Sequence, residues 1–115
     1  MQSAERMNLV FSALSDPTRR AILVQLAKGD ASVSELAKPF GMRQPTISKH
    51  LRVLEEAGLI RSGQDAQRRP RSLVVGGPLK DVDQWLARLR EQWERRFDRL
   101  ESFLETNTNP KKTDK

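Results

Sequence analysis

The sequence predicts a mainly α-helical fold with one small β-hairpin, in the order α-α-α-α-β-β-α. Three observations lead to this prediction. Apolar residues recur at steps of three and four over most of the 115-residue chain, which is the period of a helix with one buried face. Capping residues, prolines and glycines stand where such helices would begin and end. Only two short runs favour strands, and they flank a segment rich in turn-forming residues.

The first two helices are predicted from an apolar face and from a cap. Residues 4–14 place apolar side chains at helical spacing, namely Met7, Val10, Phe11 and Leu14. A second helix is expected from Pro17 to Lys28. Asp16 can cap it, Pro17 takes the first helical position, where its missing N–H costs nothing, and Gly29 follows its end.

A third, short helix is expected after Ser32. Ser32 and Glu35 match the S-x-x-E capping box, in which each side chain accepts a hydrogen bond from the other residue's backbone N–H. Pro39 limits the length of this helix, because proline has no N–H and clashes with the carbonyl four residues back. Gly41 ends it.

The fourth helix is expected from Gln44 to Ala57, with Pro45 in its first turn and Gly58 in a left-handed position after its end. One face is apolar and the other faces are polar; the apolar face carries Ile47, Leu51 and Leu54. Two short helices joined by a turn with glycine, the second polar on its outer face, are the layout of a helix-turn-helix.

A hairpin is expected next. Residues 59–62 and 72–75 are short β-prone runs, and the segment between them holds Gly, Asp, Pro and three arginines, Arg68, Arg69 and Arg71. The pattern predicts a wing with a basic tip, and therefore a winged helix-turn-helix.

The last helix, expected at residues 79–105, gives an independent argument for a partner. Its apolar residues step by three and four: Val82, Leu86, Leu89, Trp93, Phe97, Leu100 and Leu104. Such a helix is about 40 Å long, whereas a compact domain of this size is about 30 to 35 Å across. We therefore expect this row to form the dimer interface with the same helix of a second copy. Residues 1–105 are expected to form one domain, and residues 106–115 a disordered polar tail.

Composition narrows the class of protein. The 21 Lys and Arg exceed the 15 Asp and Glu, and residues 43–71 alone carry seven basic against three acidic side chains, which favours a polyanionic partner. The chain has no cysteine and a single histidine, His50, which excludes disulfide scaffolds, zinc ribbons and multi-histidine metal centres. No apolar run approaches the ~20 residues that span a bilayer, so we expect a cytoplasmic protein without a membrane partner. No nucleophile with a base, phosphate loop or spaced metal ligands supports an enzyme, a cofactor or catalytic residues.

Three ordered motifs resemble the ArsR (arsenical-resistance repressor) family of winged helix-turn-helix transcription factors. They are the segments at residues 13–20 (ALSDPTRR), 44–51 (QPTISKHL) and 54–60 (LEEAGLI). The resemblance covers residues 11–104 and implies a bacterial homodimeric repressor that binds double-stranded DNA at an inverted-repeat operator and leaves it when an effector binds.

The chain departs from the family's metal sensors. Those members place cysteines at the start of the third helix, where this chain has Ser32 and Ser34, and others use ligands that include histidine on the last helix, which has none here. A serine hydroxyl is a poor ligand for a soft metal. The resemblance therefore implies a metal-independent branch with no metal site, and leaves the effector unknown.

The resemblance also implies which side chains meet DNA. Gln44, Thr46, Ser48 and Lys49 are expected at base edges, with Gln44 suited to adenine. Arg43, His50 and Arg52, with the hairpin arginines, are expected at phosphates or the minor groove. Arg43 stands where the family commonly has a capping serine, and could reach a phosphate or a guanine.

Each of these assignments has an alternative. His50 could cap local backbone, the hairpin arginines could serve only solubility, and Arg19 and Arg20 could touch phosphate or pair with nearby acids. Trp85 and Trp93 could line an effector pocket, although a row at helical spacing more often forms a core or an interface. For the whole chain, the alternatives are a protein-interaction module and a constitutive architectural DNA binder with no effector.

Overall fold

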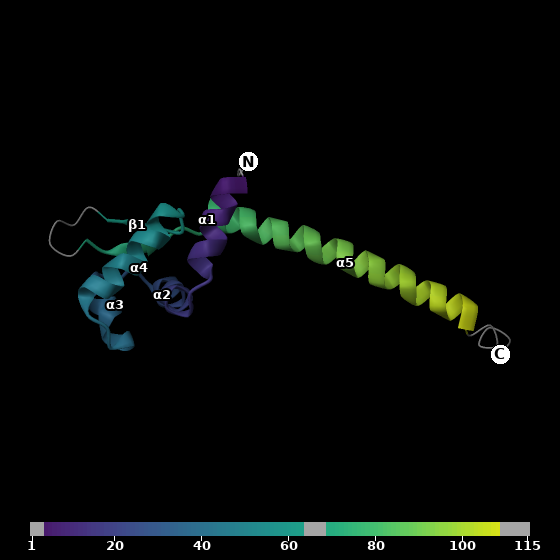
Figure 1. Ribbon diagram of the computed structural model, residues 1–115, viewed down its shortest axis with the longest axis horizontal. Coiled ribbons are helices and arrows are strands. Elements are labelled where there is room, and N and C mark those ends of the chain that lie inside the picture. The colour runs from purple at the N-terminus through teal and green to yellow at the C-terminus, as the bar shows by residue number, and fades with distance from the viewer. Residues whose placement is uncertain (1–3, 64–68, 109–115) are drawn as a thin grey trace. The chain divides into compact units, whose positions relative to one another are not determined.

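The computed structural model describes residues 4–63 and 69–108 (Figure 1). Its elements confirm the predicted order, with helices and strands that end within three residues of the expected positions. They are α1 (Ala4–Leu14), α2 (Pro17–Lys28), α3 (Val33–Phe40), α4 (Gln44–Glu56), β1 (Ile60–Ser62), β2 (Arg71–Leu73) and α5 (Pro78–Thr108). The chain divides into two units, one ending at Val82 and the other beginning at Asp83.

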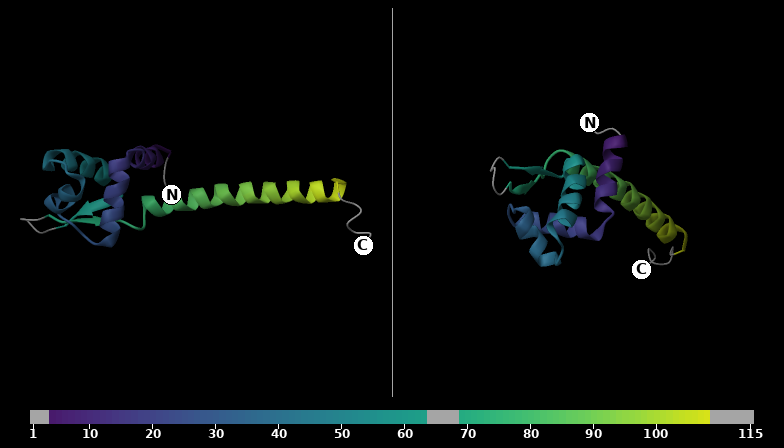
Figure 2. Two further views of the ribbon diagram at one scale, coloured as in Figure 1. Left: turned by 90° about the horizontal axis from the view of Figure 1, so that it is seen from below. Right: turned by 60° about the vertical axis from the view of Figure 1, so that its left-hand side comes forward.

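Helix α4 lies at the centre of the first unit. It packs against α1, α2, α3 and β1, and the views in Figure 2 show these elements grouped around it. The predicted apolar face is confirmed, since Ile47, Leu51 and Leu54 are at most 1% exposed. Ile22 from α2 and Leu36 from α3 complete the same core. The core thus fixes α4 from its inner face and leaves its outer face to solvent.

The caps explain where the helices begin. The Asp16 carboxylate accepts a hydrogen bond from the backbone N–H of Arg19, and Pro17 opens α2 as expected. The capping box before α3 is complete, because Ser32 Oγ accepts from the Glu35 N–H while Glu35 Oε1 accepts from the Ser32 N–H at 2.8 Å. Gly41 follows α3 in the left-handed conformation.

Gly58 follows the end of α4 and lies against Pro78, the first residue of α5. Its φ of +78° is a backbone conformation that side chains other than glycine rarely adopt. A Cβ there would lie 2.9 Å from Pro78 Cγ, so the position excludes a side chain on both counts.

Strands β1 and β2 pair antiparallel, with Ile60 opposite Leu73 and Ser62 opposite Arg71. A further bridge joins Arg71 to Ala31, the residue before the cap of α3, through backbone hydrogen bonds in both directions. The hairpin is thereby attached, at the end of β2 next to its connecting loop, to the segment that precedes α3.

Three expectations were wrong in detail. Val82, expected in the dimer interface, is 4% exposed and belongs to the core of the first unit. Phe11, expected on the buried face of α1, is exposed, and Val10 and Ala13 are buried instead. Helix α5 continues through Thr108, so residues 106–108 are helical; the rest of the expected tail, 109–115, lies outside the described residues.

Among the helices described, none combines the length and the apolar character needed to cross a membrane.

Candidate nucleic-acid interface

The polar side chains of α4 form the surface on which the sequence places DNA contacts. Most of them are exposed, namely Arg43, Gln44, Thr46, Lys49 and Arg52, whereas Ser48 and His50 are half-buried. They share one rigid helix, because the opposite face of α4 is anchored in the core by Ile47, Leu51 and Leu54. The structure therefore brings together the whole predicted set on α4.

The N-terminus of α4 has no side-chain cap. Arg43 occupies the N-cap position in an extended conformation, and its side chain makes no capping hydrogen bond. The first N–H groups of a helix have no partner within the helix and carry a partial positive charge, which favours an anion. With Pro45 removing one of these N–H groups and Arg43 adding a charge, this end of α4 is suited to a phosphate.

His50 is held by the start of α2. Its Nδ1 lies 3.4 Å from Arg19 Nη1 and 4.0 Å from Asp16 Oδ2. A guanidinium can only donate, so in the neutral ring Nδ1 accepts from Arg19 and Nε2 carries the proton. The expectation that His50 caps local backbone is replaced by this contact with side chains of α2, which leaves Nε2–H as the ring's remaining donor.

Electrostatics favour the charged form of Asp16 in this cluster. The backbone N–H of Arg19 donates to its carboxylate, and the positive charges of His50 in its protonated form and of the Arg19 guanidinium act in the same direction. Together they hold the pKa of Asp16 below its ordinary value of 3.8, against the opposing effect of burial.

Arg19 and Arg20 have a role that the sequence did not suggest. Arg19 Nε donates to the carbonyl of Ala13 at 2.8 Å and its Nη2 to that of Ser12 at 3.0 Å, and Arg20 Nη1 donates to Leu14 at 2.7 Å. The last carbonyls of a helix lack partners within it, so both arginines cap α1. The signal available in the sequence was their place just after a helix end, which puts two long donors within reach of its carbonyls.

The hairpin arginines are not equivalent. Arg69 is exposed and has a φ of +44°, while Arg68 lies outside the described residues. Arg71 is half-buried, its Nη1 donates to the Arg69 carbonyl at 2.6 Å, and its buried Nε has no hydrogen-bond partner. The guanidinium of Arg71 thus hydrogen-bonds back onto the hairpin, and its backbone is bridged to Ala31. Its expected contact with DNA stays a prediction.

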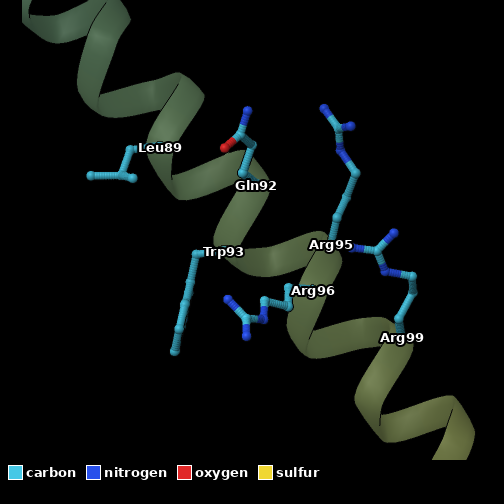
Figure 3. Close-up of a pocket in the computed structure, with 6 residues that line it drawn as sticks. All are labelled: Leu89, Gln92, Trp93, Arg95, Arg96 and Arg99. Carbon is cyan, nitrogen blue, oxygen red and sulfur yellow. The ribbon is translucent and has the colours of Figure 1, made fainter.

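The predicted interface residues of α5 beyond Val82 are all exposed. Their exposed fractions run from 43% to 65%, for Leu86, Leu89, Trp93, Phe97 and Leu100. Figure 3 shows Leu89 and Trp93 on one side of α5 and Arg95 and Arg99 on the other, around a shallow depression with walls from this helix alone. Among the described residues, Trp93 therefore lines this open depression on its own helix.

Metal-ligating side chains do not gather in the described ranges 4–63 and 69–108, where no three His, Asp or Glu residues are close enough to share an ion. The chemistry that the site offers is hydrogen bonding and positive charge, presented on a helix of the width that the major groove of DNA admits.

Known proteins are similar to this chain in both sequence and fold. Residues 16–62 match the family described as "Bacterial regulatory protein, arsR family". The transcriptional repressor SdpR of Bacillus subtilis is 44% identical over 61 residues, which are 53% of this chain and 68% of that protein. The crystal structure of an ArsR family transcriptional regulator is 45% identical with a TM-score of 0.70, covering 77% of this chain and 97% of that one.

A solution structure from Mycobacterium bovis extends the likeness. It is a homodimeric winged helix-turn-helix DNA-binding domain of a possible ArsR-family regulator, 25% identical with a TM-score of 0.60, covering 85% of this chain and 93% of that fragment. These relatives point to the same function as the exposed polar face of α4 and the adjoining hairpin. The chain belongs to the arsR family of bacterial regulatory proteins and is a winged helix-turn-helix DNA-binding transcriptional regulator.

Proposed function

We propose that the protein is a homodimeric repressor that binds an inverted-repeat operator of its own or a neighbouring operon, and that it does not sense metal ions. The single observation that carries the proposal is the exposed polar face of α4 over a fully buried apolar face. The wing and the localised positive charge support it.

The proposed contacts with DNA fall into two groups, those with base edges and those with the DNA backbone or the minor groove. Gln44, Thr46, Ser48 and Lys49 read base edges in the major groove, where an amide side chain pairs with adenine through two hydrogen bonds. Arg43, Arg52 and the Nε2–H of His50 contact phosphates, and Arg69 approaches the minor groove. Two copies related by a two-fold axis would present two α4 helices to half-sites about 34 Å apart, one turn of DNA.

Metal independence is supported by the donor set. The chain has no thiolate, and its only imidazole, His50, already lies against Arg19 and Asp16. Adding Zn²⁺ or arsenite is therefore expected to leave DNA affinity unchanged.

The test is to measure binding to the DNA upstream of the gene by fluorescence anisotropy at a series of salt concentrations. Arg52→Ala, which removes an exposed phosphate contact, should weaken binding to all sequences and reduce the slope of log affinity against log salt by about one. Gln44→Ala should instead relax sequence preference, by about 1–3 kcal/mol of discrimination at one base pair. Lys80→Ala is the matched control, because it removes the same charge from an exposed site in the first turn of α5.

The outcomes separate the alternative functions. A protein-interaction module predicts no salt-sensitive binding to this DNA. An architectural DNA binder predicts salt-sensitive binding that Gln44→Ala does not alter in sequence preference. Equal salt slopes for the wild-type, Arg52→Ala and Lys80→Ala proteins would refute the assignment of α4 as the DNA-binding helix.

A further inference from the structure

The guanidinium of Arg19 lies where three helices meet. The residue belongs to α2, and two of its nitrogens donate to the end of α1, Nε to the Ala13 carbonyl at 2.8 Å and Nη2 to the Ser12 carbonyl at 3.0 Å. Its third nitrogen, Nη1, lies 3.4 Å from Nδ1 of His50 on α4. One side chain therefore connects the end of α1 to a residue of the proposed DNA-binding face.

The two hydrogen bonds to α1 fix the direction of the third nitrogen. A guanidinium is planar and its N–H groups have a fixed geometry, so two nitrogens held by carbonyls also determine where the Nη1–H points. Arg19 is half-buried and the His50 side chain is 20% exposed, so surrounding atoms restrict both groups. Arg19 therefore presents a fixed donor to the His50 ring.

Asp16 is the other charged group that faces this ring nitrogen. Its Oδ2 lies 4.0 Å from His50 Nδ1, beyond hydrogen-bond distance, and already accepts from the Arg19 backbone N–H at 3.0 Å. A proton on Nδ1 of the neutral ring would point at the Arg19 donor and leave both donors unpaired. The neutral ring therefore carries its proton on Nε2.

We propose that Arg19 is a positioning residue for DNA binding, which holds the His50 ring in one tautomer and one orientation with Nε2–H as the donor to a phosphate. The proposal rests on the phosphate contact of His50 in the proposed function and adds the group that prepares it. A donor that is already oriented loses less conformational freedom on binding, so His50 binds the phosphate less tightly without Arg19. The contact is thereby anchored to the end of α1, a helix with no residue among the proposed DNA contacts.

Arg20 is the matched control at the next position. It also caps α1, since its Nη1 donates to the Leu14 carbonyl at 2.7 Å, and it carries the same charge. Among the described residues its guanidinium bonds to α1 and not to α4. Arg19→Met and Arg20→Met therefore both remove a cap of α1 and a positive charge while keeping an apolar stem, and they differ in the contact with His50.

The first test observes His50 in the free protein by ¹⁵N NMR. His50 is the only histidine of the chain, so its two ring-nitrogen signals identify themselves. At about pH 8, where an imidazole is neutral, the signals show which nitrogen carries the proton. We expect the Nε2–H tautomer in the wild-type and Arg20→Met proteins, and a shifted Nδ1 signal in Arg19→Met.

Arg19→Lys is a second variant for the same measurement. It keeps the charge, but it replaces three nitrogens by one, which cannot bond both carbonyls of α1 and His50 with the same geometry. It should therefore also shift the Nδ1 signal, and it serves if Arg19→Met does not fold. Unchanged His50 signals in the folded Arg19 variants would overturn the proposal.

The second test measures affinity for the DNA upstream of the gene by fluorescence anisotropy. His50→Ala should bind about tenfold more weakly than the wild-type protein, the value of one hydrogen bond to a charged group. Arg19→Met should bind about three- to tenfold more weakly than Arg20→Met, since the loss cannot exceed that of the contact it prepares. In proteins that also carry His50→Ala, this difference between the two arginine variants should vanish.

The outcomes separate this proposal from the proposed function. A difference between the arginine variants that persists with His50→Ala would show that Arg19 acts on DNA by itself, and would overturn the positioning role. Wild-type affinity in His50→Ala would refute the phosphate contact and with it the role of Arg19 in DNA binding. Absence of salt-sensitive DNA binding by the wild-type protein would instead refute the proposed function, and the NMR result on the free protein would not depend on it.

Discussion

Regularly spaced apolar side chains differ in burial on the two sides of Val82. Before it, Ile22, Leu51 and Leu54 are completely or almost completely buried within one copy. After it, Leu89 and Trp93 are at least half-exposed, although their spacing is equally regular. The same helical period therefore produces a buried core in one unit and an exposed apolar face in the other. One copy buries the first set of side chains by itself, whereas we assign the burial of the second set to a dimer of two copies.

The largest effect on stability is expected from Leu51→Ala. Leu51 is 1% exposed at the centre of α4, and removing a buried leucine side chain leaves a cavity that costs about 2–5 kcal/mol of unfolding free energy. Leu89→Ala is the matched control in the other unit and should cost less than about 0.5 kcal/mol in dilute protein. Urea denaturation measures both; equal losses would contradict the contrast between the two units.

Trp93→Ala should act on association instead of folding. A tryptophan at the centre of an interface is typically worth at least about 2 kcal/mol, so the dimer dissociation constant should rise about thirtyfold or more. Sedimentation equilibrium measures this constant. Arg95→Ala, on the opposite face of the same helix, should leave it unchanged, and a similar effect from both variants would place the interface elsewhere.

Ser32→Ala should have a smaller effect, confined to the first unit. It removes the capping box that begins α3, which should lower the unfolding free energy by about 1 kcal/mol. The exposed Ser102 of α5 caps no helix start, and Ser102→Ala should be neutral in the same thermal or urea measurement. Loss of dimer without loss of stability in Ser32→Ala would be inconsistent with a local role for this cap.

The smallest effect is a change in acid sensitivity. The pKa of Asp16 is lower in the folded protein than its ordinary value of 3.8, so its carboxylate stabilises the fold above that pH. This contribution is lost as pH falls through the lowered pKa. Stability of the wild-type protein should therefore fall more steeply with acidification below about pH 4 than that of Asp16→Asn, in which the amide still caps α2. Parallel curves from urea titrations at several pH values would show that Asp16 carries no such linkage.

The sequence predicted the helices well because each signal is local. Asp16, Ser32 and Gly41 mark helix ends through their own backbone neighbours, and all three positions are confirmed. Burial was predicted less well, because periodicity identifies a face and does not say which element covers it. Val82 and Leu86 continue one row, yet only Val82 meets the core of its own chain.

The candidate site shows the same limit. The exposed set on α4 followed from the helix period, but two side chains depend on contacts distant in sequence. Arg71 folds back beside the bridge to Ala31, and His50 lies against Arg19, which is 31 residues away. The pattern of residues within one segment does not predict a contact with a residue that is distant in the sequence.

Gly58 has a practical meaning for anyone who builds chimaeras from these regulators. Its backbone is left-handed, and a Cβ built on it would lie 2.9 Å from Pro78 Cγ, so the end of α4 and the beginning of α5 fit together only with glycine at this position. An α5 transplanted from a relative should therefore be joined after Val82, with Gly58 and Pro78 kept from the same parent. A junction placed before Pro78 would bring Gly58 and Pro78 from different parents, and the packing of α5 against the end of α4 would then no longer be matched.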